Sequence, residues 1–158
     1  MVEAEDMLKI KPKPVYTYGY STRSLEEFLE ILKAFNIEVA VDVRRFPASK
    51  RKPEFSRENL SLELPKAGIE YVWLGDLLGG YRSGGYKKHM KTKIFKEGLK
   101  RLIEIADRKT TVIFCCEALW FRCHRRFLAE KLAKIGFKVF HIYDKKRISL
   151  HKIKRSSK

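Results

Sequence analysis

The chain has 158 residues, 44% of them hydrophobic, which is enough for one well-packed domain and too few for two. This hydrophobic content excludes a disordered chain, and no apolar run approaches the roughly 20 residues needed to span a bilayer. The three cysteines, an odd number, suit a reducing compartment. Together these features predict a soluble, cytoplasmic protein that does not enter a membrane.

Charge is the strongest compositional signal. Lysine and arginine number 35 against 19 aspartates and glutamates, so the formal net charge is +16. A field of this size concentrates polyanions, and we therefore expect a nucleic acid as the partner, DNA more than RNA. A lysine-rich surface with ion-pair networks is the alternative, but such a surface needs more acidic residues than this chain has.

Segments with strand and helix patterns alternate along the chain. Short β-branched or aromatic runs predict strands at residues 15–19, 38–43, 69–73, 112–114 and 137–143. Apolar residues at helical spacing predict helices at residues 25–35, 57–66, 92–108 and 123–135. This alternation predicts an α/β fold with a mostly parallel central sheet of about five strands and helices on both faces.

The two ends of the chain differ from this pattern. Residues 1–14 are polar and carry a Lys-Pro-Lys-Pro repeat, so we predict an N-terminal tail there. Residues 15–144 form the single predicted domain. Residues 145–158 are rich in lysine and arginine and are predicted to be a basic C-terminal tail.

Chemically capable residues follow the predicted strands. In an open α/β sheet, ligands bind outside the carboxyl ends of the strands, so residues at these ends are expected to share one site. They are Tyr20 and Ser21 after the first strand, Asp42, Arg44 and Arg45 after the second, Gly79 and Gly80 after the third, and Glu117 after the fourth.

Two carboxylates are the candidate catalytic groups. Asp42 ends an apolar strand, where an ionised carboxylate needs a partner. It either forms a salt bridge with Arg44 or Arg125, or acts as a general base or electrostatic stabiliser. Glu117 lies among cysteines, a histidine and arginines, and the same two interpretations apply to it.

The cysteines allow more than one interpretation. Six residues separate Cys116 from Cys123, a longer spacing than structural zinc sites use, so we expect no metal, and nothing predicts a cofactor. Cys123 at a helix start would have a lowered pKa and could act as a nucleophile. His124 beside it on a helix would not face it, however. Cys115 and Cys116 are interpreted as buried, inert thiols.

Basic and aromatic residues supply the substrate-binding candidates. One basic loop contains Lys50 and Arg51, and a glycine-rich loop contains Tyr81 and Arg82. Interleaved cations and aromatic rings suit a phosphate track with base-stacking platforms, and solvated loops are the alternative. At the start of the last helix, His124 and Arg125 suit an anion or the edge of a base.

The blocks that carry these residues resemble the signature blocks of the family of domains of unknown function numbered 488. They are Gly19–Ser21, Asp42–Ser49, Leu74–Gly80, and Cys116–Glu117 with Cys123–Arg125. Tyr20 stands where the family more usually has a histidine. The resemblance implies no reaction. It implies a compact α/β domain with one pocket that contains Asp42, Arg44, Glu117, Cys123, His124 and Arg125.

We expect an enzyme that acts on nucleic acid, and specifically a DNA base-lesion glycosylase or another base-modifying repair enzyme. Asp42 and Glu117 would orient water or stabilise an oxocarbenium-like sugar, while Tyr20, Tyr81 or Trp120 would hold the unstacked base. One alternative is a non-catalytic nucleic-acid-binding module. Another is a hydrolase or sulfur-handling enzyme that depends on Cys123 and acts on a small phosphorylated substrate.

Overall fold

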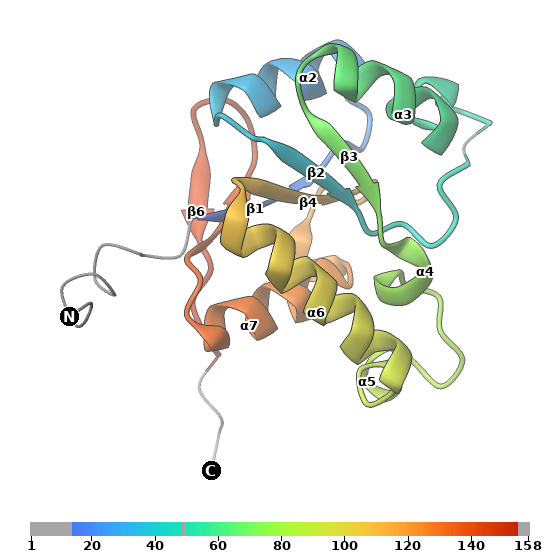
Figure 1. The fold of residues 1–158 in the computed structure, drawn as a ribbon, viewed down its shortest axis with the longest axis vertical. Coiled ribbons are helices and arrows are strands. Elements are labelled where there is room, and N and C mark those ends of the chain that lie inside the picture. Colours follow the sequence, from blue (N-terminus) through green and yellow to red (C-terminus); the bar gives the residue numbers. More distant parts are fainter. Residues whose placement is uncertain (1–13, 49, 155–158) are drawn as a thin grey trace, which may run out of the picture.

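A computed structural model describes residues 14–48 and 50–154 (Figure 1). It has a six-stranded sheet in the order β3-β2-β4-β1-β5-β6, in which only the pairing of β5 with β6 is antiparallel. The strands are β1 (Val15–Gly19), β2 (Val39–Asp42), β3 (Glu70–Trp73), β4 (Thr111–Cys115), β5 (Val139–Ile142) and β6 (Ile148–Leu150). The α/β class and the mostly parallel sheet predicted from the sequence are therefore confirmed.

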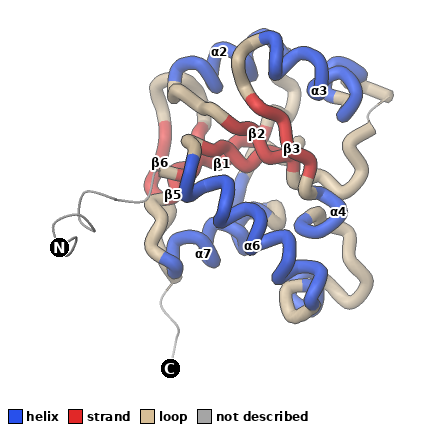
Figure 2. Tube along the Cα trace, viewed as in Figure 1, coloured by secondary structure: helices blue, strands red, loops and turns tan. Residues whose placement is uncertain are grey.

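Helices cover both faces of this sheet (Figure 2). The helices are α2 (Leu25–Ala34), α3 (Arg57–Lys66), α4 (Gly75–Leu78), α5 (Tyr86–His89), α6 (Lys93–Arg108) and α7 (Arg125–Ile135), with 3-10 turns η1 (Pro53–Phe55) and η2 (Trp120–Arg122). Helices α2 and α3 lie on one face, and α6 and α7 lie on the other with α4 and α5 beside them (Figure 1). Among the described residues, no helix is long and apolar enough to cross a bilayer.

Alternation along the central strands divides the core into two layers. On β4, Val112 and Phe114 pack under α2 and α3, whereas Ile113 and Cys115 face α6 and α7. All of β4 is buried, as expected for a parallel strand covered on both faces. Burial of each large apolar side chain contributes roughly 1.5–3 kcal/mol, so the two layers make the sheet a rigid support for its carboxyl edge.

The sixth strand is the main departure from the predicted fold. Strand β6 lies in the segment predicted as a basic tail, and pairs Ile142 with Ile148 and Phe140 with Leu150. A tight turn makes this pairing local, because the Asp144 carboxylate accepts hydrogen bonds from the backbone N–H groups of Lys146 and Arg147. Three residues among many cations are too short a run to stand out in the sequence. Of the predicted N-terminal tail, residues 1–13 lie outside the described residues.

Candidate functional site

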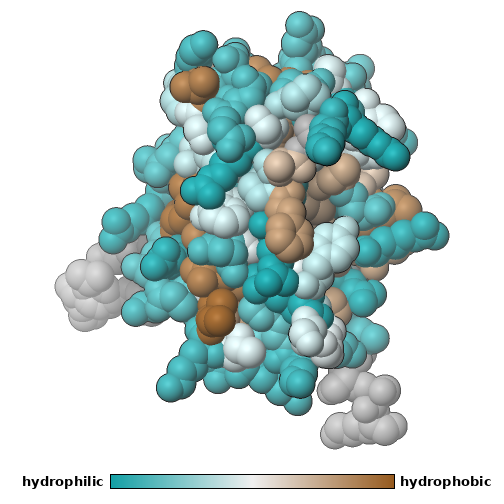
Figure 3. All heavy atoms as spheres, turned by 90° about the vertical axis from the view of Figure 1, so that its right-hand side faces the viewer, coloured by the Kyte–Doolittle hydropathy of each residue, from teal (hydrophilic) through white to brown (hydrophobic). Residues whose placement is uncertain are grey.

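A cavity of about 520 Å³ opens at the carboxyl edge of the sheet. Its arginine and aromatic lining consists of Arg44, Arg45, Arg122, Arg126, Tyr20, Phe46, Tyr81, Tyr86 and Phe127. The remaining lining residues are Ala48, Gly80, Cys115, Cys116, Glu117, Cys123 and His124. Figure 3 views the right-hand side of Figure 1, where β3 runs into α4; pale and tan side chains gather near the centre of this face among hydrophilic ones.

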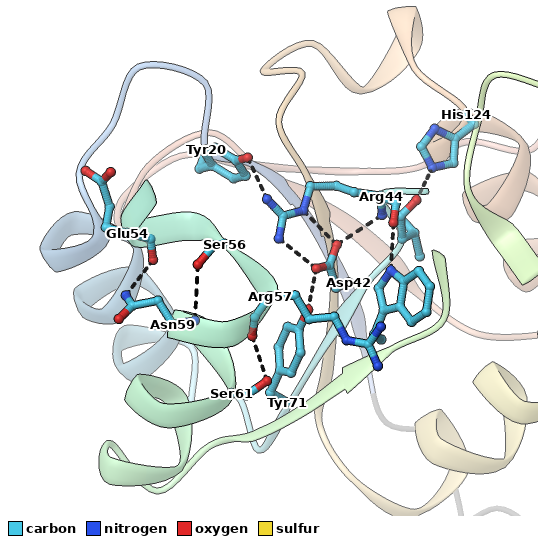
Figure 4. A network of polar contacts seen from close by, with 12 residues as sticks. Tyr20, Asp42, Arg44, Glu54, Ser56, Arg57, Asn59, Ser61, Tyr71 and His124 are labelled. Carbon is cyan, nitrogen blue, oxygen red and sulfur yellow. Dashed lines mark hydrogen bonds and ion pairs between the residues drawn. The ribbon is translucent and has the colours of Figure 1, made fainter. Parts of the chain in front are cut away.

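Asp42 lies beneath one wall of the cavity and has no exposed surface. Its two carboxylate oxygens accept hydrogen bonds from Arg44 Nε at 2.8 Å, Arg44 Nη2 at 2.7 Å and the Tyr71 hydroxyl at 2.6 Å (Figure 4). The Arg44 backbone N–H donates a further bond at 3.0 Å. Both oxygens are thus committed to structural partners, and Asp42 is not part of the cavity lining.

Arg44 and two tyrosines enclose this carboxylate. Arg44 Nη1 donates to the Tyr20 hydroxyl at 2.9 Å, and the Tyr20 ring stacks on Phe55 with centroids 3.9 Å apart. Burial raises the pKa of Tyr20 to about 12 and also raises the pKa of Tyr71. Both hydroxyls therefore stay protonated at neutral pH and can only hold this pair in place.

Cys123 forms the centre of the opposite wall, just before α7. The predicted helix began at Cys123, but α7 begins at Arg125 and Cys123 has extended backbone angles, φ −133° and ψ 163°. This conformation lets its Sγ lie 3.1 Å from Cys115 Sγ and 3.7 Å from His124 Nδ1. Cys123 and His124 were expected not to face each other because both were placed on a helix. Cys123 lies before the helix, and the two side chains are in contact.

The environment of Cys123 favours the thiolate. A hydrogen bond from the Cys115 thiol lowers the pKa of Cys123, burial opposes this, and His124 and Arg125 lower it further. The backbone N–H of Arg125 lies 3.3 Å from the sulfur and its Nε lies 3.4 Å from it. The pKa of Cys115 is raised by the same hydrogen bond and by burial, so Cys115 is the protonated partner.

Arg125 gives an independent reason for a negative charge on Cys123. Its side chain is only 1% exposed, and among the described residues it forms no ion pair with a carboxylate. It donates to the carbonyl oxygen of Glu117, to Thr17 Oγ1 at 3.3 Å and to Cys123 Sγ. A buried guanidinium needs a counter-charge, and the thiolate of Cys123 is the group within reach.

A chain of hydrogen bonds continues from Arg125 through the sheet. Thr17 Oγ1 lies 2.7 Å from His141 Nδ1, and His141 Nε2 lies 3.0 Å from His151 Nδ1. His151 Nε2 then lies 2.8 Å from Glu130 Oε1. Each group can donate to the next in one direction, from the guanidinium to the carboxylate, when His141 accepts at Nδ1 and donates at Nε2. Burial lowers the pKa of His141 to about 3, with contributions from His151 and Arg125, which fits this arrangement.

His124 joins the two walls of the cavity. Its Nε2 lies 2.8 Å from the carbonyl oxygen of Val43, and because a carbonyl only accepts, Nε2 carries a proton (Figure 4). The other ring nitrogen, Nδ1, faces Cys123 Sγ at 3.7 Å. A Cβ atom on Gly80 would lie 3.3 Å from His124 Nδ1, so Gly80 leaves little spare room beside the imidazole.

Glu117 is the carboxylate that does line the cavity. Its side chain is exposed, and its Oε1 accepts a hydrogen bond from the backbone N–H of Leu119 at 3.1 Å. Its carbonyl oxygen lies where a Cβ on Gly19 would stand, 1.7 Å away. Glycine at position 19 is thus what lets the Glu117 loop lie on the end of β1, where Arg125 can bind it.

Exposed rings form the mouth of the cavity. Tyr81 is 88% exposed and Phe46 is 65% exposed, with ring centroids 6.4 Å apart. Arg45 holds them together, because its Nη1 donates to the Tyr81 carbonyl oxygen at 2.6 Å and its guanidinium lies over the Phe46 ring at 5.3 Å. Two flat apolar surfaces and a cation therefore face solvent at one edge.

The structure brings together part of the site predicted from the sequence. Within the cavity lining are Tyr20, Arg44, Arg45, Gly80, Tyr81, Glu117, Cys123 and His124. Outside it are Ser21, Asp42, Lys50, Arg51, Gly79, Arg82 and Arg125. Several of these support the site instead: the Ser21 backbone N–H binds the Cys116 carbonyl oxygen at 2.7 Å. Arg82 donates to the carbonyl oxygens of Gly75 and Asp76 in α4 and of Gly79 directly after it.

Two arginines and two phenylalanines line the cavity although they were not among the predicted site residues. Arg122 and Arg126 flank the Cys-His-Arg block, so their place beside it in the sequence is a signal that marks them as lining residues. Phe46 and Phe127 carried no such signal, because one lies in an irregular loop and the other has the spacing of a core residue. Among the described residues, no group of three or more histidine, cysteine or acidic side chains could hold a metal ion.

Comparison with known proteins gives one match. The family model described as Domain of unknown function DUF488 matches residues 24–132, more than half of the chain. Neither the curated proteins nor the solved structures contain a match to this chain.

Proposed function

The chain belongs to the DUF488 family, and we propose that it is a cysteine-dependent enzyme that acts on nucleic acid, DNA more than RNA, in the cavity at the carboxyl edge of its sheet. The observation that carries this proposal is the contact of a buried arginine with the sulfur of Cys123 on the cavity wall. Arg125 needs a counter-charge, and Cys123 supplies it with a sulfur that also faces the cavity.

The charge and shape of the cavity support a polyanionic substrate. Arg45, Arg122 and Arg126 line it in addition to Arg44, whose charge is already balanced by Asp42. Flat rings at the mouth suit stacking on an unpaired base, which contributes roughly 1–3 kcal/mol per base. Arginines position phosphates and rings hold bases, so the lining combines both requirements of single-stranded or flipped-out nucleic acid.

Each group near Cys123 has a role in nucleophilic catalysis. The Cys123 sulfur forms a bond to an electrophilic centre of the substrate, and the bond to the leaving group breaks with its electron pair. His124 Nδ1 donates a proton to the leaving group. Glu117, exposed on the same wall, orients the water that later displaces the sulfur. Arg125 holds the sulfur and the Glu117 loop in one geometry.

Alkylation of Cys123 tests this proposal without knowledge of the reaction. Iodoacetamide at pH 6 should modify Cys123 at least about tenfold faster than a thiol of ordinary pKa, because the thiolate is the reactive form. A single-stranded DNA oligonucleotide should protect Cys123 at the concentrations that saturate binding, and an RNA of the same sequence should protect less. Oligonucleotide binding that leaves the alkylation rate unchanged would contradict the proposal.

Charge-removing variants locate the bound strand. Arg122→Gln and Arg126→Gln should each weaken binding and reduce the salt dependence by about one counterion. Arg101→Gln is the matched control, because Arg101 is paired with Glu97 on α6 and is 57% exposed outside the cavity. Equal losses in all three variants would mean that binding follows net charge and not the cavity.

Base removal by a carboxylate is the second candidate function. The base-lesion glycosylase expected from the sequence would depend on Glu117, since Asp42 is enclosed by Arg44 and Tyr71. The exposed carboxylate on the cavity wall is the observation that favours it. Incubation with duplexes that contain damaged bases separates the candidates: Glu117→Gln would abolish base release and Cys123→Ser would spare it. Loss in the Cys123 variant alone supports the thiolate enzyme.

A non-catalytic nucleic-acid-binding module is the third candidate. The observation that favours it is the structural engagement of the motif residues, such as Asp42 with Arg44 and His124 with Val43. A module would bind oligonucleotides equally well with serine at position 123 and would form no covalent adduct at Cys123 with any of them. Capture of such an adduct by mass spectrometry would exclude this candidate.

A further inference from the structure

The two sulfurs nearest each other lie at the end of β4 and before α7. Cys115 Sγ and Cys123 Sγ are 3.1 Å apart, and both line the cavity. A disulfide needs about 2.05 Å between sulfurs, so the two atoms are within about 1 Å of bonding distance. Cys116, the remaining cysteine, follows Cys115 directly in the sequence. It is exposed, so the expectation that it is a buried thiol was wrong.

The two thiols differ in the way that a reactive and a resolving cysteine must differ. Cys123 lies beside Arg125 and His124, which stabilise its anion, and it is partly exposed to the cavity. Cys115 is buried with its sulfur 3.1 Å from that of Cys123, and its raised pKa makes it the protonated member of the pair. The thiolate is the form that peroxides oxidise, so oxidation should begin at Cys123 and not at its protonated neighbour.

We propose that Cys123 is a site of oxidation by hydrogen peroxide and that Cys115 converts the product to an intramolecular disulfide. In the first step the Cys123 thiolate attacks one oxygen of hydrogen peroxide and the O–O bond breaks. The other oxygen leaves as hydroxide, and Cys123 becomes a sulfenic acid. In the second step the Cys115 sulfur attacks the sulfenic sulfur, and its proton and the sulfenic hydroxyl leave as water. Two thiols are oxidised and one peroxide is reduced to two waters.

The first step prepares the second electrostatically. While Cys123 is an anion, it holds the proton on Cys115. A sulfenic acid is neutral, so this restraint disappears, while Arg125 remains beside the pair and favours the anion of Cys115. The disulfide then removes the nucleophile and the counter-charge of Arg125 in one event. Oxidation should therefore inactivate the cavity reversibly, whatever substrate the cavity binds.

Peptide mapping tests the proposal on the full-length protein. Trypsin cuts after Lys109, Arg122 and Arg125, so Cys115 and Cys116 share one peptide and Cys123 lies in another. In a Cys116→Ser background, Cys115 is the sole thiol of the first peptide. Peroxide should join the two peptides with a loss of two hydrogens, and dithiothreitol should separate them.

Further variants keep the test decisive. Cys115→Ser should leave a sulfenic acid at Cys123 that dimedone traps, at least about tenfold more than in the protein with Cys115. Cys123→Ser should resist oxidation at position 115. If serine at 115 prevents folding, the joined peptides from the Cys116→Ser protein still decide the question. Sulfinic acid at Cys123 without joined peptides, or a disulfide between two chains, would overturn the proposal.

Discussion

Two buried arginines support the same cavity, and they differ in the group that balances their charge. Arg44 is 9% exposed and pairs with the Asp42 carboxylate at 2.7 Å. Arg125 is 1% exposed and lies against the sulfur of Cys123, with Nε 3.4 Å away. Both cations are held at the carboxyl edge of the sheet, yet one partner is sealed away and the other faces the cavity.

The difference decides which arginine can take part in chemistry. A carboxylate that accepts four hydrogen bonds from its neighbours has no oxygen left for a substrate and is a poor nucleophile. A thiolate titrates, is oxidised and attacks electrophiles. The Arg44 pair is therefore a brace, whereas the Arg125 pair couples a structural charge to a reactive atom.

Asp42→Asn should break the brace and have the largest effect. The amide keeps the shape of the side chain but leaves the Arg44 guanidinium buried without a counter-charge, which costs about 3–5 kcal/mol in the free energy of unfolding. Urea denaturation measures this loss. Glu63→Gln is the control, because Glu63 pairs with an exposed lysine on α3 and should change stability by less than about 0.5 kcal/mol. A loss for Asp42→Asn as small as the control would mean that the brace is not required.

Gly19→Ala should disturb the Arg125 side next. The added Cβ would meet the Glu117 carbonyl oxygen at 1.7 Å and Arg125 Nη2 at 2.7 Å, so the loop must move away from β1. We expect a loss of about 3 kcal/mol by urea denaturation. Gly80→Ala is the control, since its Cβ would contact only the His124 ring, at 3.3 Å. Equal losses in the two variants would contradict this interpretation.

The difference between the two arginines also shows which features of the site could not be predicted from the sequence. Alternating strand and helix patterns predicted the α/β class, which the structure confirms. The rule that ligands bind at the carboxyl ends of strands predicted a shared site at one edge of the sheet, and a cavity opens at that edge. Asp42 looked catalytic because a strand-end carboxylate has the same sequence signature whether it is free or enclosed. What encloses it is Tyr71, 29 residues away, which binds it because β2 and β3 are neighbours in the sheet.

Long-range contacts hid other features for the same reason. The pairing of Cys115 with Cys123 depends on Cys123 lying before α7 and not within it. The helix start was off by two residues, which was enough to turn Cys123 away from the expected position. His141 and His151 carry no local motif, and their link to Thr17 and Glu130 exists only because β5 and β6 pair beside β1.

Cys123→Ser should have an intermediate effect that depends on pH. Serine supplies no anion, so Arg125 loses its counter-charge at a cost of about 1–3 kcal/mol near pH 8. The folded pKa of Cys123 is below its unfolded value, so the thiolate contributes stability above the unfolded pKa of about 8.5, and this contribution falls as the pH drops toward the folded pKa. The difference between wild type and variant should therefore shrink in acid.

Cys116→Ser is the matched control for that measurement. Cys116 is exposed, and the change to serine should alter stability by less than about 0.5 kcal/mol at every pH. A constant difference between wild type and Cys123→Ser from pH 9 to pH 5 would mean that position 123 holds a neutral thiol, and that Arg125 is balanced in some other way.

His141→Phe should change the pH dependence of stability in acid, and it shows how far the Arg125 side extends. Trp120 stacks on the His141 ring at 3.9 Å, and phenylalanine keeps a flat ring there while it removes both nitrogens. The pKa of His141 falls from 6.5 to about 3 in the folded protein, so the unfolded chain alone takes up this proton between these values. The free energy of unfolding should therefore fall by up to about 1.4 kcal/mol for each unit by which the pH is lowered across this window. The variant should lose that part of the slope, while groups that do not contact His141, such as the buried His89, contribute equally to both proteins and cancel. Identical slopes would mean that His141 is protonated in the folded state, and its Nδ1 would then donate to Thr17 Oγ1 instead of accepting from it.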